Sequence, residues 1–254
     1  GDVELELEPG AATRGAVVRT YAATIERLER VGRDVMLVTL ALEGGERIGF
    51  EAGQYIDILL DDGDRRSYSF TVGSGDADRI ELHVRRQPGG KFTTQLFERA
   101  KVGDRLRFAG PYGQFVLNEP SAKPLIFVAG ATGFAPVKSL LEQAFRLGIE
   151  RPLWFYWGVR ERADLYMAEL PERWAREHPN FKFVPVLSEP RPGDGWSGRT
   201  GLVHDAILAD FADLSGFAIY ACGSVRMVAA ARPAFLAQGL AESACYSDAF
   251  VPAR

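Results

Sequence analysis

The chain has 254 residues, of which 46% are hydrophobic and 25% charged, and its formal net charge is -4. This composition is typical of folded globular proteins, the length suits two domains, and the acidic balance argues against a general nucleic-acid-binding protein. No apolar run approaches the roughly 20 residues of a membrane span, and Cys222 and Cys245 are too few for a disulfide framework or a thiolate metal site, so we predict a cytoplasmic protein without membrane association or a metal site.

The N-terminal part of the chain has the pattern of antiparallel strands. Residues 1–16 begin with a stretch in which apolar and acidic residues alternate. Pro9 and Gly10 follow it, which is typical of a linker. After them, short alternating segments are separated by Gly-rich or Asp-rich turns, and one helical segment covers 91–99. The predicted strands are 17–28, 35–42, 54–60, 66–72, 80–86 and 105–108. This pattern predicts a six-stranded antiparallel β-barrel over residues 17–119.

The pattern changes after Pro120, where short apolar runs alternate with longer helical segments. The predicted strands are 125–129, 153–157, 182–187, 217–221 and 245–247, and the predicted helices are 135–147, 168–177, 202–208 and 225–238. Pro233 lies inside the last helix and is expected to kink or split it. Apolar strands joined by helices are typical of a parallel sheet covered on both faces, so we predict an α/β domain with a five-stranded parallel sheet over residues 120–254.

The strand that begins at Arg66 combines an anion-binding guanidinium, an aromatic ring and hydroxyl groups. Because side chains alternate along a strand, Tyr68 and Ser69 point to opposite faces. A planar ring laid across the strand end could stack on Tyr68, accept a hydrogen bond from Ser69 and have its phosphate bound by Arg66, which suits a flavin. A half-buried strand with polar outward residues has the same pattern, so these residues alone leave both interpretations open.

Two glycine turns each open a predicted helix. The first is Gly130-Ala131-Thr132-Gly133, and the second is Gly89-Gly90-Lys91-Phe92-Thr93, with Arg85 just upstream. Glycines let the backbone approach a pyrophosphate, and the free amides of a helix start attract its charge. The alternatives are a tight strand-to-helix turn for the first and a capped surface helix with a solvated basic patch for the second.

Two further candidates lie near the end of the chain. Cys222 and Gly223 follow a predicted parallel strand, and ligands of open α/β sheets collect at such strand ends. Asp248 and Phe250 place a carboxylate and an aromatic ring just before the chain stops. The alternatives are a buried structural cysteine and a terminal strand that packs Phe250 into the core.

Taken in order, these motifs resemble the ferredoxin-NADP reductase superfamily, and within it the NADH-dependent, FAD-containing reductase components of bacterial ring-hydroxylating dioxygenases and multicomponent monooxygenases. The likeness covers residues 17–252 and includes Tyr-Trp-Gly-Val-Arg at 156–160, Asp-Leu-Tyr at 164–166 and Met227 after Cys222-Gly223. It implies an FAD-binding barrel at 17–119 and an NAD(P)H-binding domain at 120–254.

The resemblance also implies roles for individual residues. Arg66 would bind the flavin pyrophosphate, Tyr68 would pack on the flavin ring, and Phe250 would cover the ring face that the nicotinamide must occupy. The implied FAD-binding residues are Arg66, Ser67, Tyr68, Ser69, His83, Val84, Arg85, Gly89, Gly90, Lys91, Phe92, Thr93 and Phe250. The implied nucleotide-binding residues are Gly130, Ala131, Thr132, Gly133, Pro136, Arg160, Cys222, Gly223 and Met227. The implied catalytic residues are Ser69, Cys222, Asp248 and Phe250.

The implied activity is that of an NAD(P)H-dependent flavoprotein reductase. A hydride would pass from NADH to FAD, and single electrons would then pass to an iron-sulfur centre that feeds an oxygenase component. Arg160 and Arg162 would suit the 2'-phosphate of NADPH, but the 156–166 arrangement resembles NADH users, so NADH is favoured. The alternatives are a deoxysugar-pathway or flavohaemoglobin-type reductase and a non-catalytic flavin-binding electron-transfer subunit.

The chain departs from the family pattern in three places. Ala131 stands where a glycine is usual and Ser224 where a proline is usual. The C-x4-C-x2-C cysteines of a two-iron two-sulfur cluster do not occur, so the cluster would lie in a missing domain or a partner. Residues 2–8 resemble the piece that follows such a ferredoxin domain, which leads us to expect that 1–16 is a linker left from a removed N-terminal domain; a separate ferredoxin is the other possibility.

Overall fold

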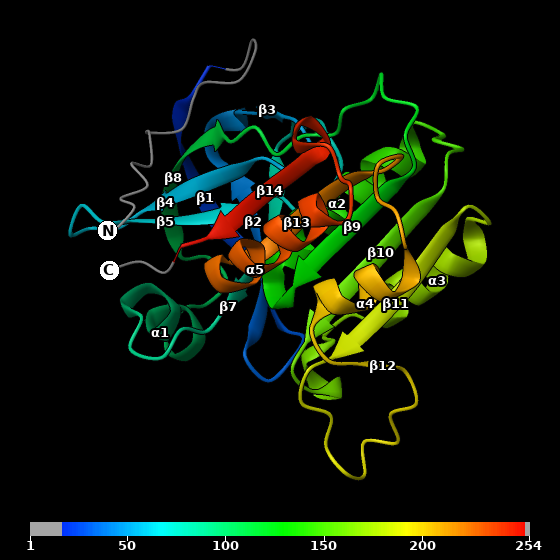
Figure 1. Cartoon of the computed structure of the whole chain (residues 1–254). Helices are drawn as coiled ribbons and strands as arrows, with labels where there is room; N and C mark the ends of the chain where they lie inside the picture. The colour runs from blue at the N-terminus through cyan, green and yellow to red at the C-terminus, as the bar shows by residue number, and fades with distance from the viewer. Residues whose placement is uncertain (1–16, 252–254) are drawn as a thin grey trace, which may run out of the picture.

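The computed structural model describes residues 17–251, and its N-terminal half is built mainly of strands (Figure 1). They are β1 (Arg19–Arg30), β2 (Val35–Leu42), β3 (Ile48–Phe50), β4 (Tyr55–Leu59), β5 (Arg65–Ser69), β6 (Gly75–Ala77), β7 (Arg79–Arg85) and β8 (Arg105–Tyr112), with the 3-10 turn η1 (Glu43–Gly45) and helix α1 (Lys91–Glu98). Six of them form an antiparallel sheet in the order β5-β4-β8-β1-β2-β7, and β5 contacts β7, which curls the sheet toward a barrel. The predicted barrel is confirmed.

Alternation along these strands produces the barrel core. Ile56 and Ile58 of β4 and Ile80, Leu82 and Val84 of β7 are all buried in one apolar cluster. The intervening residues, such as Asp57 in β4 and Glu81 and His83 in β7, point away from this cluster, because successive side chains of a strand point to opposite faces. β7 therefore has one apolar face and one polar face, and the polar face is turned toward the second domain.

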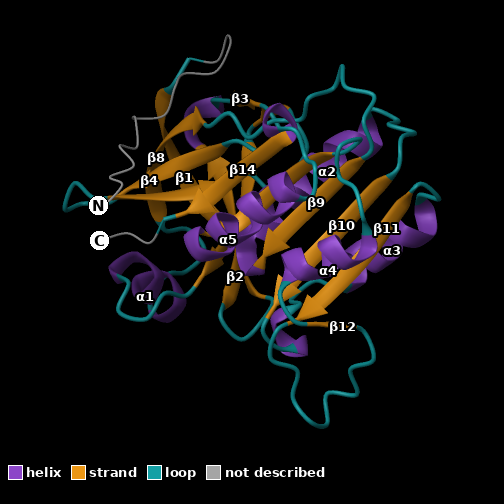
Figure 2. Cartoon of the chain, viewed as in Figure 1, coloured by secondary structure: helices purple, strands orange, loops and turns teal. Residues whose placement is uncertain are grey.

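The C-terminal half alternates strands and helices (Figure 2). Its strands are β9 (Leu125–Gly130), β10 (Leu153–Val159), β11 (Phe181–Leu187), β12 (Arg199–Thr200), β13 (Ala218–Ser224) and β14 (Cys245–Phe250). Its helices are α2 (Phe134–Arg146), α3 (Glu169–Glu177), α4 (Val203–Asp210) and α5 (Val225–Ala237), with 3-10 turns η2 (Ala131–Gly133), η3 (Arg162–Asp164) and η4 (Glu242–Ala244). The strands form one parallel sheet in the order β12-β11-β10-β9-β13-β14.

Helices cover both faces of the parallel sheet. α4 and α5 contact each other on the face turned toward the viewer in Figure 1. α2 and α3 also pack together, through the rings of Phe145 and Trp174 at 5.4 Å between centroids. The C-terminal ends of β9, β10, β13 and β14 lie along one edge of the sheet, because all of these strands are parallel.

The structure adds details that the sequence pattern did not predict. The parallel sheet has a sixth strand, β12, whose two exposed polar residues give no apolar signal. The described chain also has a small separate sheet of β3 and β6. α5 continues through Pro233, so the expected split does not occur. The predicted linker at 1–16 lies outside the described residues. Within 17–251, no helix is both long and apolar enough to cross a membrane.

The two halves share an apolar interface. Val35, Ala52 and Phe115, which come from the barrel and the segment that follows it, belong to the core cluster of the C-terminal half. The connector between β8 and β9 covers residues 113–124, and the predicted boundary after residue 119 lies within it. Asn118 of this connector donates its backbone N–H to the Tyr220 hydroxyl at 2.8 Å. This hydrogen bond attaches the connector to β13 of the parallel sheet.

Candidate functional site

β5 places the predicted flavin residues on two faces. Tyr68 points toward the barrel interior and lies 5.8 Å from the ring of Phe92, centroid to centroid. Burial raises the pKa of Tyr68, so its phenol stays neutral. Ser67 points outward and donates its hydroxyl to Asp57 at 2.7 Å. Arg66 pairs with Asp64 at 3.1 Å beside this aromatic pair.

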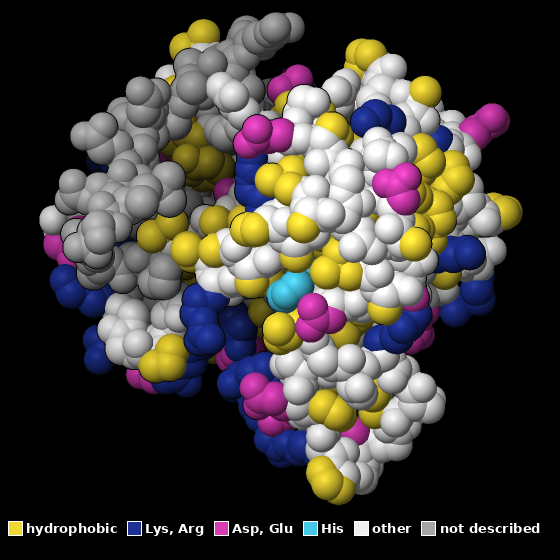
Figure 3. Space-filling view, in the orientation of Figure 1, with side chains coloured by type: hydrophobic (Ala, Val, Ile, Leu, Met, Phe, Trp, Pro, Cys, Tyr) yellow, Lys and Arg dark blue, Asp and Glu magenta, His cyan; other side chains and the backbone are white. Residues whose placement is uncertain are grey.

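The turn before α1 has the form of an anion cradle. Gly89 has a φ of 73°, and a Cβ on Gly90 would lie 2.8 Å from the Thr93 hydroxyl, so the turn leaves no room for a side chain at Gly90. Thr93 accepts from the backbone N–H of Gln87 at 3.1 Å, and no side chain caps the helix start. Together with the positive charges of Arg66 and Lys91, this donor set fits a pyrophosphate. Figure 3 shows Lys and Arg side chains gathered around α1.

β7 divides its predicted flavin residues between its two faces. The Val84 side chain lies in the barrel core, whereas His83 faces the C-terminal half, where its Nδ1 is 2.9 Å from the Tyr166 hydroxyl. A ring on one side of β7 therefore cannot contact both side chains. Burial lowers the pKa of His83, which keeps the imidazole neutral. Arg85 donates to Asp34 at 2.7 Å.

The nucleotide loop follows β9 and presses against the end of β13. Ala131 has a φ of 49°, a left-handed conformation that strains a residue with a Cβ, and its carbonyl accepts from the Trp157 indole N–H at 2.9 Å. Thr132 is half-buried beside it. A Cβ on Gly133 would lie 2.2 Å from the Cys222 carbonyl oxygen. Gly133 is therefore needed for the loop to approach β13.

Gly130 and Gly223 also allow a close approach between β9 and β13. A Cβ on Gly130 would lie 2.5 Å from the sulfur of Met227, and one on Gly223 would lie 3.1 Å from the Cα of Gly130. These glycines bring the ends of β9 and β13 together, in addition to the ligand contact predicted for them. Pro136 is buried in the first turn of α2, and Ser224 caps α5 by accepting from the Met227 N–H at 3.2 Å. Ser224, at the position where the resemblance led us to expect a proline, thus serves as a helix cap.

The predicted catalytic residues of β13 and β14 lie side by side. Cys222 pairs with Asp248 in the parallel register, and Ser224 pairs with Phe250. Burial raises the pKa of the Cys222 thiol, so the thiolate is disfavoured and a nucleophilic role is unsuited to it. Burial also raises the pKa of Asp248 to about 6. Phe250 is half-buried against the core of the C-terminal half.

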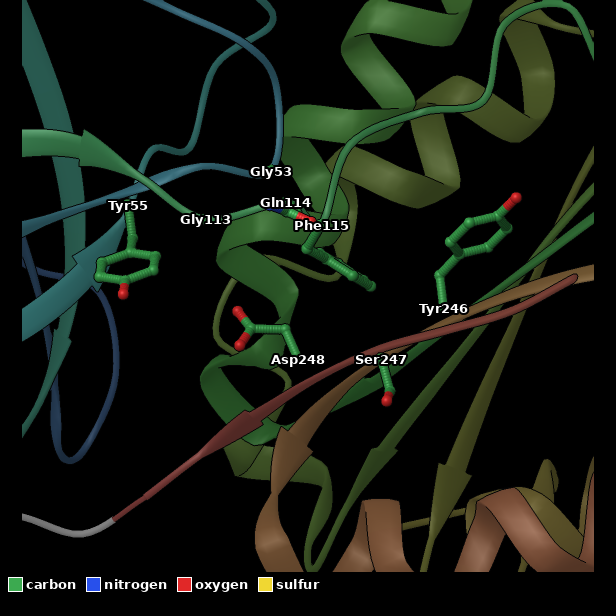
Figure 4. Close-up of a pocket in the computed structure, with 8 residues that line it drawn as sticks. All are labelled: Gly53, Tyr55, Gly113, Gln114, Phe115, Tyr246, Ser247 and Asp248. Atoms are coloured by element: carbon green, nitrogen blue, oxygen red, sulfur yellow. The ribbon is translucent and has the colours of Figure 1, made fainter. Parts of the chain in front are cut away.

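Asp248 opens onto a cavity between the two halves (Figure 4). The cavity has a volume of about 210 Å3 and is lined by Gly53, Tyr55, Gly113, Gln114, Phe115, Tyr246, Ser247 and Asp248. Tyr55 lies directly opposite Ser69 in the pairing of β4 with β5. Since directly opposed side chains share a face, Ser69 lies on the sheet face that carries Tyr55.

A second hollow contains charged residues from both halves. It has a volume of about 750 Å3 and is lined by Asp34, Arg85, Arg86, Gln87, Pro88 and Arg160. Arg85 was predicted to bind the flavin and Arg160 to bind the nucleotide, and both lie on this one hollow. The hollow contains three arginines: Arg85 at the end of β7, Arg86 after it, and Arg160 after β10. Their guanidinium groups are suited to binding phosphate.

Sequence reasoning missed three residues of this region. Tyr55 lines the cavity of Asp248, Asp34 holds Arg85, and Lys138 of α2 donates to the Thr71 carbonyl at 2.9 Å. Tyr55 lies in an ordinary alternating strand pattern and Asp34 in a hairpin turn, so neither gave a signal. Lys138 was a detectable signal, because it is a lysine on the apolar face of the helix predicted at 135–147, where charged residues are rare.

The comparisons with known proteins agree with this geometry. Residues 22–117 match the oxidoreductase FAD-binding domain, and residues 127–233 match the oxidoreductase NAD-binding domain. Over 255 residues the chain is 41% identical to the CDP-6-deoxy-L-threo-D-glycero-4-hexulose-3-dehydrase reductase of Yersinia pseudotuberculosis, covering 100% of this chain and 75% of that protein. It is 36% identical to reductase component 2 of the terephthalate 1,2-dioxygenase of a Comamonas species, covering 96% and 70%.

A solved structure shows the same arrangement. The Amycolatopsis cytochrome P450 reductase GcoB superposes with a TM-score of 0.87 at 34% identity, over 93% of this chain and 71% of that one. The matched domains bind FAD and NAD, and the named relatives are reductases. The chain therefore belongs to the ferredoxin-NADP reductase family of FAD- and NAD-binding oxidoreductases.

Proposed function

We propose that the chain oxidises NADH and passes single electrons to an iron-sulfur centre, held by a ferredoxin domain or a separate ferredoxin, that feeds an oxygenase component. The observation that carries this is a direct hydrogen bond between the nucleotide helix and the segment after the flavin strand: Lys138 of α2 donates to the carbonyl of Thr71, two residues beyond Ser69. The flavin and nucleotide motifs therefore share one interface. Bound FAD would accept the two electrons of a hydride together and release them one at a time.

The residues of the chain would hold and orient both cofactors. Arg66 and the turn at Gly90 would bind the FAD pyrophosphate, and Tyr68 would pack on its ring system. Gly130 and Gly133 would let the nucleotide approach the end of β9. Phe250 would cover the reactive ring and exclude water until the nicotinamide takes its place.

Charges beyond β10 favour NADH over NADPH. Arg33 pairs with Glu161 at 2.9 Å and with Asp164 at 3.1 Å, and Arg191 also pairs with Glu161. The carboxylates therefore already engage cations near Arg160, which itself lies 3.8 Å from Asp164. These arginines are thus already engaged by carboxylates and are less available to bind a 2'-phosphate. We expect kcat/KM to be higher for NADH, and a clear preference for NADPH would overturn this choice.

An anaerobic titration tests the proposal against a non-catalytic flavin-binding subunit. The holoprotein should lose its long-wavelength flavin absorbance after one equivalent of NADH, because hydride transfer consumes one nucleotide for each flavin. Slow or absent bleaching would indicate the non-catalytic alternative. Addition of an oxidised two-iron two-sulfur ferredoxin should then restore the flavin absorbance as the ferredoxin is reduced.

A second candidate function follows from the 41% identity to a CDP-6-deoxyhexulose dehydrase reductase over the whole chain. In that case, electrons would pass to a sugar-modifying dehydrase in place of an oxygenase. The NADH-reduced protein can be mixed rapidly with each type of acceptor. Faster reduction of the dehydrase than of an oxygenase-type ferredoxin would favour this second function, while the reverse would favour the first.

A further inference from the structure

α2 carries buried polar side chains on the face that meets the barrel. Lys138 and Gln143 are each 6% exposed, and Ser139 is fully buried. Lysine and glutamine are seldom buried to this degree unless partners compensate them. Partners for these side chains are therefore expected across the interface, and the structure provides them.

All three side chains bind one short segment of the barrel. Lys138 Nζ donates to the Thr71 carbonyl at 2.9 Å, and the Ser139 hydroxyl donates to the Val72 carbonyl. The Gln143 side-chain oxygen accepts from the Ser74 N–H at 3.1 Å. Residues 71–74 begin two residues after the end of β5, the strand of the flavin motif. α2 thus holds this segment at three successive points.

The same helix face also presses on the neighbouring barrel loop. The Ser139 hydroxyl accepts from the Gly53 N–H at 3.2 Å, and a Cβ on Gly53 would lie 3.2 Å from the Leu140 side chain. Gly53 has a φ of 92°, a conformation that favours glycine. The contact between α2 and the barrel is therefore close and leaves little freedom for sliding.

Charges reinforce the attachment at Lys138. Its ammonium lies 2.8 Å from Glu142 on the next turn of α2. Glu81 of β7 accepts from the Thr71 hydroxyl at 2.9 Å, and its pKa is lowered to about 2, chiefly by His83 and also by the charge of Lys138. Removal of the ammonium would leave the Glu81 carboxylate with less compensation in a mostly buried position.

The two residues joined by this contact, Lys138 and Thr71, each lie close in sequence to a proposed cofactor site. α2 begins immediately after Gly133 of the nucleotide loop, and Lys138 lies five residues further, about 7 to 8 Å along the helix. On the barrel side, Thr71 lies two residues beyond Ser69. One rigid helix thus connects the nucleotide loop with the flavin strand.

Resting on the proposed function, we propose that Lys138 is a positioning residue for hydride transfer: through Thr71 it fixes the nucleotide loop relative to the flavin strand. Hydride transfer needs the donor and acceptor atoms about 3 to 3.5 Å apart, and a displacement of about 1 Å can cost about 100-fold in rate. Lys138 touches neither ring and acts only by fixing the two halves in register.

The test uses the FAD-loaded protein and the variant Lys138→Met, which keeps the alkyl chain but loses the ammonium. The rate constant of flavin reduction should fall at least about tenfold, while the Kd for the nucleotide stays within about threefold. Lys138→Arg should restore much of the rate. Lys182→Met, which removes an exposed lysine of β11, should leave the rate unchanged.

Hydrogen exchange gives a readout that is independent of activity. In the FAD-loaded protein without nucleotide, the backbone amides of residues 72–74 should exchange faster in Lys138→Met than in the wild type, because the segment is released from α2. The long-wavelength charge-transfer absorbance between nicotinamide and flavin should also weaken, which a purely structural role of Lys138 would not explain.

Wild-type reduction rates in Lys138→Met would overturn the positioning role while the proposed function stands. If Lys138→Met does not retain FAD, Lys138→Gln is measured in the same way, since its shorter neutral side chain also lacks the ammonium that binds the Thr71 carbonyl. An unchanged rate in Lys138→Gln then overturns the proposal, and a slowed rate with an unchanged Kd supports it. If NADH does not reduce the wild type, the proposed function itself fails.

Discussion

Burial controls the chemistry of the two neighbouring residues at the end of the parallel sheet. Cys222 is fully buried, and its raised pKa keeps it a thiol. Asp248, beside it in the next strand, has a pKa raised to about 6. Near neutral pH the pair therefore consists of a neutral thiol and a carboxylate that gains a proton on mild acidification. A neutral thiol is unsuited to nucleophilic attack, because the thiolate is the nucleophile.

Asp248 should make the stability of the protein depend on pH. Its pKa is 3.8 when unperturbed and about 6 in the fold, so between these values the folded protein keeps a proton that the unfolded chain releases. Stability from this group therefore falls as pH rises through this window and stays lower above it, by at most about 3 kcal/mol. We expect Asp248→Asn to have a higher Tm than the wild type at pH 8, with the difference vanishing near pH 4.

A matched control distinguishes this effect from a general change in charge. Asp61 is exposed, so Asp61→Asn should shift the Tm little at any pH. A difference between Asp248→Asn and the wild type that does not change with pH would show that Asp248 is not the titrating group.

Ser69 is the second residue with a specific expectation. Its side chain is 5% exposed and lies opposite Tyr55, which lines the cavity of Asp248. Ser69→Ala removes one hydroxyl without changing the packing of Tyr68, so FAD should remain bound while rapid-mixing flavin reduction slows about tenfold or more. Ser197→Ala, in an exposed loop, provides the control. Unchanged reduction in Ser69→Ala would remove this hydroxyl from the mechanism.

At the scale of elements, prediction succeeded where apolar runs were long. The run predicted at 125–129 is β9 (Leu125–Gly130), and the helix predicted at 135–147 is α2 (Phe134–Arg146). β12 was missed because two polar residues carry no apolar signal and form a strand only by pairing with the end of β11. Short strands of this kind depend on tertiary contacts, which a local pattern does not contain.

The candidate site was predictable as an ordered set of motifs but not as a set of contacts. The glycine turns at 89–90 and 130–133 were evident from their positions between strands and helices. The pairing of Thr71 with Lys138 and the shared cavity of Tyr55 and Asp248 join residues that are distant in sequence, so no local pattern indicates them. The same limit hid the packing role of Gly133, since the atom that excludes a side chain there belongs to Cys222.

Gly133 should be intolerant of even one methyl group. Its backbone is helical, so alanine would otherwise be accepted, but a Cβ would lie 2.2 Å from the Cys222 carbonyl oxygen. Because backbone atoms must move, Gly133→Ala should lower the free energy of unfolding by about 1 to 3 kcal/mol and weaken nucleotide binding. Gly216→Ala, where a Cβ meets nothing within 4 Å, should stay within about 0.5 kcal/mol in chemical denaturation. Equal stabilities would contradict the close approach of the loop to β13.

At the scale of the whole molecule, two kinds of polar contact join the halves. The exposed kind is the ion pairing of Arg33, in the hairpin after β1, with Glu161 and Asp164. The buried kind includes the contacts of Lys138 and Ser139 with the barrel and the 2.9 Å contact of the Tyr166 hydroxyl with Nδ1 of His83. Exposed ion pairs contribute at most about 1 kcal/mol, whereas a buried polar atom that loses its partner costs about 1 to 3 kcal/mol. Each buried contact should therefore contribute more to the stability of the interface than an exposed ion pair does.

The comparison of Tyr166→Phe with Arg33→Ala tests this ranking. Tyr166→Phe keeps the ring that packs on Phe134 and Trp157 but leaves His83 Nδ1 buried without its partner, so it should be the more destabilising change in urea denaturation. The loss in Arg33→Ala should shrink further at high salt, because screening weakens exposed ion pairs, while the loss in Tyr166→Phe should not depend on salt. A larger loss in Arg33→Ala would mean that the ionic rim, and not the buried histidine contact, holds the barrel against the parallel sheet.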